Sequence, residues 1–128
     1  MAPTIEAKKV SSKKRTTKPK ANFPAAKKLR TRLMLTQPKF ARLLPGSTRT
    51  VSELERGTIP SEPVARRLIE LERLTKALSE VIRPDSLGKW LQSPNAAFDG
   101  LKPLEVIEHG EIDRLWEMIY FLRSGVPS

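Results

Sequence analysis

The segment from residue 36 to residue 57 limits the fold more than any other part of this 128-residue sequence. Two short apolar-patterned runs lie within it, each preceded by a residue that caps helices and followed by residues that end them. The caps and stops are Thr36, Pro45, Gly46, Ser47 and Gly57. The apolar spacing predicts helices over 36–44 and 48–56. Their inward-facing residues are expected to be Phe40, Ala41, Leu44, Val51 and Leu54. Two short helices joined by a tight turn form a helix-turn-helix.

The pattern of this segment, T-Q-x-x-F-A-x-x-L-x-x-S-x-x-T-V-S-x-L-E-R-G, resembles the DNA-binding domain of the lambda-repressor/Xre family over about residues 25–75. The resemblance implies that helix 48–56 enters the major groove by its N-terminal end. Arg49 would then hold a guanine, and Glu53 would accept from a cytosine amine. The residues placed toward base edges are Thr48, Arg49, Ser52 and Glu53. Those placed near phosphates are Gln37, Arg42 and Arg56.

Glu55 is expected to be structural in this resemblance, in an ion pair with a neighbouring arginine. Two features depart from the family pattern, namely Pro45-Gly46 in the turn and the acidic Glu53 on the DNA-facing side. An ordinary helical hairpin with chance similarity is the alternative interpretation.

The charge of the chain is strongly positive and unevenly distributed. Lys and Arg number 24 against 14 Asp and Glu, giving a net charge of +10, which favours polyanionic partners. Residues 1–28 hold nine bases and one acid (+8), residues 29–78 ten bases and five acids (+5), and residues 79–128 five bases and eight acids (−3). Residues 1–24 lack apolar periodicity and are expected to form a disordered basic tail, either a solubilising tail or an arm that follows DNA.

The remaining sequence predicts further helices, and the fold class is therefore all-α. A helix over 25–35 and a long one over 63–82 would complete a helix-turn-helix domain at 25–78. The seam of the long helix either closes that core or packs on a partner helix. A small helical module at 79–128 would end in a helix over 111–123. The residues of that last helix expected to face inward are Ile112, Leu115, Trp116, Ile119 and Leu122.

This module carries a second resemblance. The elements W-L-x-x-P-N at 90–95 and G-x-x-P-L at 100–104, with Gly125-Val126 at the end, resemble the C-terminal toxin-binding domain of the MbcA/ParS/Xre antitoxin family over about residues 84–128. That family neutralises RES-domain toxins, which deplete NAD. The resemblance implies that the C-terminal end covers the active site of such a toxin through Arg123, Ser124, Gly125 and Val126. The acidic residues of 79–128 would complement a toxin cleft that attracts anionic NAD, or they would form an ordinary solvated surface.

Several classes of function are disfavoured. The sequence lacks cysteine, a phosphate-binding G-x-x-x-x-G-K-[ST] loop and a G-x-G-x-x-G motif, and its single histidine, His109, stands before Gly110 at a predicted helix end. We therefore expect no enzyme activity, metal site or cofactor. With no apolar run long enough for a membrane span and no secretory signal, a cytoplasmic protein is expected.

The expected partners are double-stranded operator DNA and a RES-domain toxin, in a homodimer or a toxin–antitoxin hetero-oligomer. One alternative is a stand-alone helix-turn-helix transcriptional regulator whose C-terminal module only dimerises. Another is a basic protein that associates with RNA or membranes through its first 28 residues.

Overall fold

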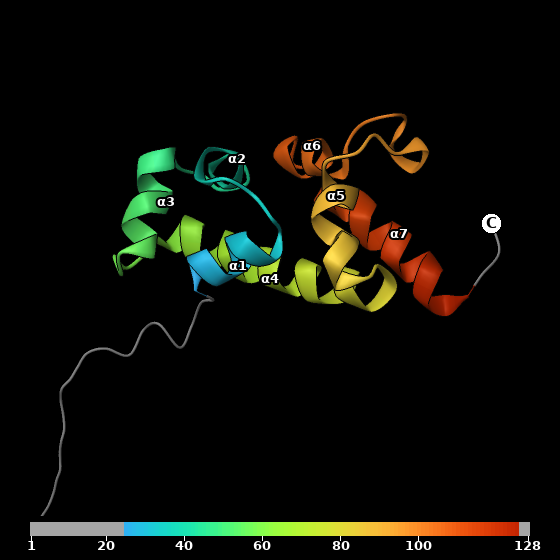
Figure 1. Cartoon of the computed structure of the whole chain (residues 1–128), viewed down its shortest axis with the longest axis horizontal. Coiled ribbons are helices and arrows are strands. Elements are labelled where there is room, and N and C mark those ends of the chain that lie inside the picture. Colours follow the sequence, from blue (N-terminus) through green and yellow to red (C-terminus); the bar gives the residue numbers. More distant parts are fainter. Residues whose placement is uncertain (1–24, 126–128) are drawn as a thin grey trace, which may run out of the picture.

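A computed structural model describes residues 25–125 of the chain (Figure 1). The predicted tail at 1–24 and Val126 lie outside the described residues. Within 25–125, all regular structure is helical, in agreement with the all-α prediction. The α-helices are α1 (Ala26–Arg32), α2 (Gln37–Ala41), α3 (Thr48–Glu55), α4 (Glu62–Val81), α5 (Leu87–Leu91), α6 (Pro103–Glu108) and α7 (Ile112–Ser124). Two 3₁₀ turns, η2 (Pro84–Ser86) and η3 (Ala96–Phe98), flank α5.

The helices α1 to α3 gather around the first half of α4, and their boundaries follow from local capping. Thr36 accepts a hydrogen bond from the Lys39 amide at the start of α2, and Ser47 accepts one from the Thr50 amide at the start of α3. Gly57 follows α3 with a φ of 104°, a conformation that favours glycine. The caps predicted for both helices are thus confirmed, and these local bonds set the short connection between α2 and α3.

The second of these helices is shorter than the sequence predicted. The expected helix over 36–44 ends at Ala41, and residues 42–45 form turns. Leu43 and Leu44 are nevertheless buried, because the turn folds back over the same core. Pro45 cannot donate a backbone hydrogen bond, so it does not extend the helix into the connection.

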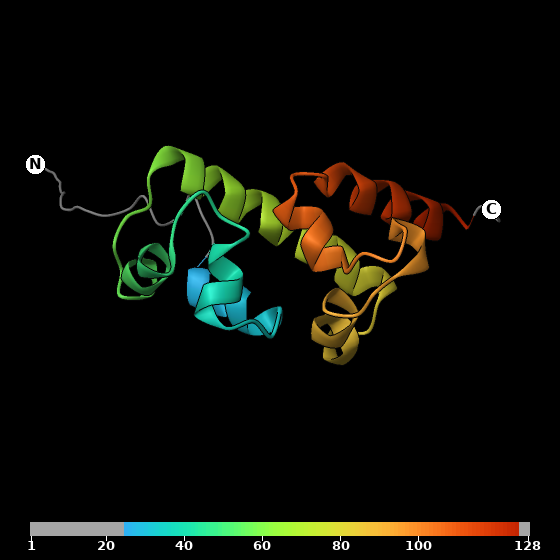
Figure 2. The same cartoon turned by 90° about the horizontal axis from the view of Figure 1, so that it is seen from above.

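Helix α4 packs against both groups of shorter helices. It runs along most of the length of the described part, with α1–α3 at one end and α5–α7 at the other (Figure 2). Its buried residues continue along both halves, and a single contiguous core joins the two ends. The buried positions include Val64, Leu68, Leu71, Leu74, Leu78 and Ala77. Of the two alternatives for the seam of α4, intramolecular packing is therefore observed, and its second half packs against α7. The predicted boundary at residue 78 falls inside this continuous helix.

The packing of α7 agrees with the sequence expectation except at its last turn. Ile112, Leu115 and Ile119 are buried, and Trp116 is half-buried against the core. The expectation that Leu122 faces inward is wrong, because its side chain is 55% exposed. The last turn of α7 projects past the neighbouring helices (Figure 1), so the other helices of residues 25–125 leave this position largely uncovered.

Candidate functional site

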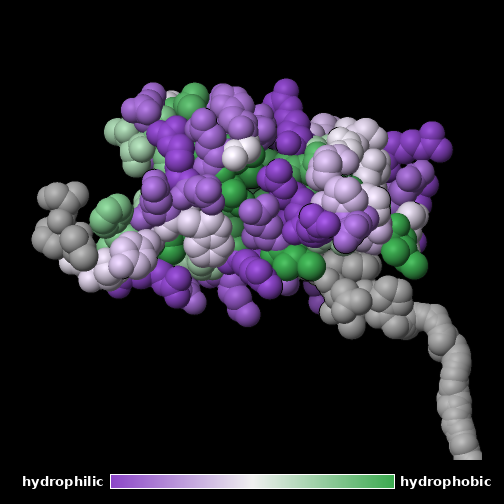
Figure 3. Space-filling view, turned by 180° about the vertical axis from the view of Figure 1, so that it is seen from behind, coloured by the Kyte–Doolittle hydropathy of each residue, from purple (hydrophilic) through white to green (hydrophobic). Residues whose placement is uncertain are grey.

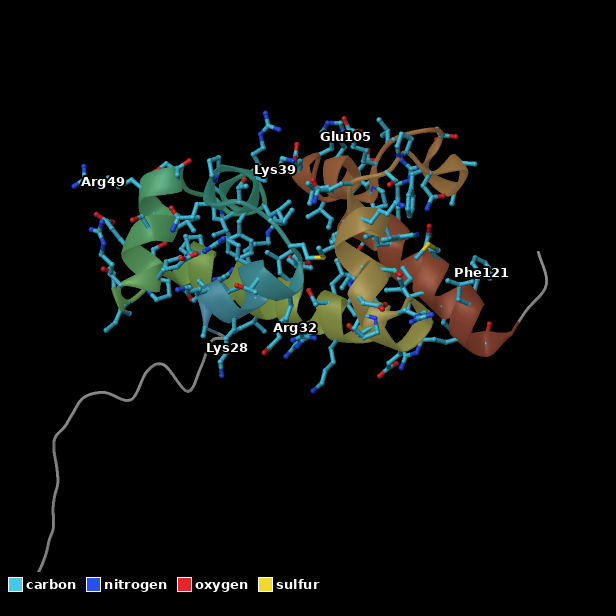
Figure 4. All side chains as sticks on the ribbon, in the orientation of Figure 1. Lys28, Arg32, Lys39, Arg49, Glu105 and Phe121 are labelled. Atoms are coloured by element: carbon cyan, nitrogen blue, oxygen red, sulfur yellow. The ribbon has the colours of Figure 1, made fainter. Side chains whose placement is uncertain are left out.

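Helix α3 presents the side chains predicted to face DNA on the outside of the molecule. Thr48 and Arg49 are exposed, whereas Ser52 and Glu53 are half-exposed. Val51 on the opposite side is fully buried, which anchors the helix to the core. Arg49 lies at the outer end of α3, clear of the rest of the protein (Figure 4). Its Nε donates to Oε2 of Glu53 over 3.1 Å, so the carboxylate predicted to accept from cytosine instead holds an arginine of its own helix.

A partly buried ion pair fixes the other end of α3. The Arg30 guanidinium of α1 donates to both carboxylate oxygens of Glu55, and its second bond, from Nη2 to Oε1, measures 3.0 Å. The structural role expected of Glu55 in an ion pair is thus confirmed, but the prediction that its partner is a neighbouring arginine is wrong, because Arg30 lies 25 residues away on α1. The hydrogen bond from Arg30 holds the pKa of Glu55 below its ordinary value, and the same contact raises the pKa of Arg30.

Gln37 also forms a hydrogen bond with the carboxylate of this ion pair. Its Nε2 donates to Oε1 of Glu55 over 3.1 Å, so the amide predicted to lie near a phosphate bridges α2 and α3. Arg30 also donates from Nη1 to the Leu35 carbonyl over 3.0 Å, which ties in the segment between α1 and α2. One carboxylate therefore joins all three small helices.

Two cations in and directly after α2, Lys39 and Arg42, contact residues of the C-terminal module. Arg42 Nη1 lies 4.0 Å from Oε2 of Glu108 on α6, and Lys39 Nζ donates to Oε1 of Gln92 over 2.9 Å. Figure 4 shows Lys39 on the same side of the molecule as Glu105 of α6. Arg56, the third predicted phosphate contact, is exposed after the end of α3. Lys39 is not among the predicted site residues; its position in the first turn of α2, two residues after Gln37, was the available signal.

The end of α7 carries an exposed apolar surface that the sequence analysis missed. Tyr120, Phe121 and Leu122 are 69%, 53% and 55% exposed, respectively, and we call these three residues the apolar end patch. Grooves lie on both sides of Phe121; one is lined also by Trp116 and Ile119, and the other by Phe98 and Met118. In the view from behind, hydrophobic residues lie beside the C-terminal residues, and others lie in the middle of this face and at its opposite end (Figure 3). Helical spacing was the available signal, since 120 and 121 fall off the buried 112–115–119 face.

The residues predicted to enter a toxin directly follow this patch. Arg123 Nη2 pairs with Oε1 of Glu80 on α4 over 3.1 Å, and both side chains are about half exposed. Ser124 Oγ donates to the Phe121 carbonyl, and Gly125 has a φ of 67° that ends the helix. Arg123, Ser124 and Gly125 therefore lie at the exposed end of the molecule, whereas Val126 lies beyond the described residues.

Within residues 25–125, no group of three or more histidine and acidic side chains is arranged to hold a metal ion. None of the helices described is sufficiently long and apolar to span a bilayer. His109 is exposed and caps the C-terminal end of α6, as its position before Gly110 predicted.

Comparisons with known proteins identify the family to which the chain belongs. No protein-family model matches the chain. The crystal structure of the M. tuberculosis MbcT–MbcA toxin–antitoxin complex contains a chain of similar fold, with a TM-score of 0.66 and 30% identity, covering 81% of this chain and 95% of that one. Among sequences, the mycobacterial cidal antitoxin MbcA of Mycobacterium tuberculosis H37Rv is 32% identical over 96 residues, which cover 74% of this chain and 85% of that protein. MbcA of Mycobacterium bovis matches to the same extent. The chain therefore belongs to the family of the antitoxin MbcA.

Proposed function

We propose that this chain is the antitoxin of a type II toxin–antitoxin pair. It neutralises a RES-type, NAD-depleting toxin by covering the toxin's active site with its C-terminal end, and it represses its own operon by binding operator DNA through α3. Family membership supports the antitoxin role, because the similar chain of known structure is an antitoxin in complex with its toxin. The resemblance of residues 84–128 to the toxin-binding domain supports the RES class.

The apolar end patch is the observation that carries the toxin-binding part of this proposal. Three adjacent large apolar side chains remain in water at the end of α7, immediately before the predicted inserting segment. Aromatic side chains that become buried in a complex contribute most to binding energy. The apolar end patch would bind the toxin surface beside the active-site cleft, so that residues 123–128 enter the cleft.

The Arg123–Glu80 pair does not oppose this arrangement. Both side chains are about half exposed, and ion pairs at such positions contribute little to stability. Arg123 can therefore leave Glu80 for an acceptor on the toxin at a small cost. The net charge of −3 over residues 79–128 would complement a cleft that admits anionic NAD.

Co-expression with a RES-type toxin, sought first in the neighbouring reading frame, tests the proposal. The wild-type chain should rescue growth, and Phe121→Ser should weaken toxin binding by about 30-fold, which corresponds to a hot-spot loss of ~2 kcal/mol. Ile59→Ser is the control, because it removes an apolar side chain that is at least as exposed from the other end of the molecule. Equal binding by the two variants would refute the role of the patch, and rescue by residues 1–83 alone would refute the toxin-binding assignment.

The apolar end patch also favours a second candidate, a stand-alone transcriptional regulator that dimerises through α7. In that case the free protein would be dimeric, and Phe121→Ser would yield monomers in sedimentation equilibrium. Neutralisation of a RES-type toxin by the wild-type chain would exclude this candidate as the main function. A neighbouring gene without a RES-type product would favour it.

A further inference from the structure

We infer that Glu53 is a positioning residue that orients Arg49 toward a guanine and thereby sets the sequence specificity of α3. The inference rests on the proposed DNA-binding role of this helix. Arg49 and Glu53 are four residues apart on the outer face of α3, and the Nε of Arg49 donates to Oε2 of Glu53 over 3.1 Å. In the free protein, Glu53 is thus already engaged as an acceptor.

The hydrogen bond leaves the recognising part of Arg49 available. A guanidinium has five N–H donors, and the bond from Nε uses one of them. The two Nη groups still offer a planar pair of donors, which matches the O6 and N7 acceptors of guanine. An arginine also has large rotamer freedom, so holding its head in place beforehand reduces the entropy lost when it contacts a base.

The position of the pair in the helix argues against a merely stabilising role. Arg49 lies in the first turn of α3, where the helix dipole disfavours a cation. The order arginine before glutamate is also the less stabilising one for pairs spaced by four residues. Glu62 and Arg66 of α4 have the opposite, favourable order at a similar distance of 3.2 Å, and they provide a natural comparison.

The carboxylate also changes how α3 interacts with DNA of any sequence. The Glu53 carboxylate, 3.1 Å from the Arg49 guanidinium, offsets part of the attraction of Arg49 to phosphates. A guanine in the correct position can still accept hydrogen bonds from the two Nη groups of Arg49. Glu53 therefore weakens non-specific binding more than specific binding.

The test uses the full-length purified protein and a random-sequence duplex pool, from which the wild-type chain selects its preferred site. Fluorescence anisotropy then compares the selected duplex with one carrying adenine in place of the guanine assigned to Arg49. Glu53→Gln should reduce discrimination at that base pair about tenfold, within the range of one bidentate contact. It should also tighten binding to a scrambled duplex and steepen the salt dependence by about 0.9 in log–log slope, as one more phosphate contact would.

Two controls separate positioning from structure and from independent base reading. Glu62→Gln, which removes the comparison pair on α4, should leave discrimination unchanged, and circular dichroism should show the same melting curve for both variants. Adding Glu53→Gln to Arg49→Ala should cause no further loss at the guanine position. Additive losses, or a Glu53→Gln effect confined to a different base pair, would overturn the inference and make Glu53 a reader in its own right. If the wild-type chain selects no site at all, the DNA-binding proposal fails; a selected site with unchanged Glu53→Gln discrimination refutes only the role of Glu53.

Discussion

Removing the carboxylate of Glu55 should destabilise the protein far more than removing any other charge on α3. The side chains of Arg30 and Glu55 are 19% and 9% exposed, so little water replaces the lost partner. Glu55→Ala leaves the Arg30 guanidinium and the Gln37 amide without their shared acceptor. Breaking a fully buried pair costs about 3–5 kcal/mol, and the residual exposure of Arg30 places the expected loss near ~3 kcal/mol.

Urea denaturation followed by circular dichroism measures this loss directly. Glu62→Ala, which removes an exposed partner of Arg66, should change the free energy of unfolding by less than about 0.5 kcal/mol. The double variant Arg30→Met/Glu55→Leu should recover part of the stability, because it leaves no buried charge unpaired, while the Leu35 carbonyl and the Gln37 amide still lose their partners. A Glu55→Ala loss no larger than that of Glu62→Ala would refute the proposed role of the pair in holding α1, α2 and α3 together.

The remaining predictions concern acidity, packing and DNA. The hydrogen bond from Arg30 lowers the pKa of Glu55 below its ordinary value. The ionised carboxylate therefore stabilises the fold above the ordinary pKa of glutamate, and this stabilisation should be lost as the pH falls through the lower pKa of the folded state. Glu55→Gln should flatten this part of the acid-unfolding curve. Gly88→Ala should cost about 1–3 kcal/mol in urea denaturation, because a Cβ there would lie 2.5 Å from the Met34 side chain, and wild-type stability would contradict that contact. Arg49→Ala should cost about 1–3 kcal/mol on the selected duplex alone, whereas Arg42→Ala should weaken all duplexes alike in anisotropy titrations; identical effects would argue against base reading by α3. Glu108→Gln should tighten binding to every duplex by freeing Arg42 from its partner on α6, and unchanged affinity would exclude competition between that contact and phosphates.

The sequence predicted those parts of the fold that depend on local chemistry. Thr36 and Ser47 cap the helices that their side chains predicted, and Gly57 adopts the conformation that only glycine reaches easily. The buried faces of α1, α3 and α4 follow helical periodicity, as expected for helices that cover one core. These features are set by neighbours within a few residues along the chain.

The contacts between distant segments could not be read from periodicity. Nothing in the spacing of residues identifies Arg30 as the partner of Glu55, or shows that Lys39 and Arg42 meet Gln92 and Glu108. Leu122 follows the apolar pattern of α7 but lies beyond the helices that cover the earlier turns. Periodicity reports which face of a helix is apolar; it does not report where the partner of that face ends.

Protection of NAD by full-length and truncated chains measures whether the C-terminal end blocks the toxin's active site. A purified toxin of the proposed RES class would be mixed with the full chain or with a chain ending at Leu122, which keeps the apolar end patch and lacks residues 123–128. If the C-terminal end covers the active site, both chains bind the toxin and only the full chain preserves NAD. Equal protection of NAD by the truncated chain would contradict the claim that the C-terminal end covers the active site.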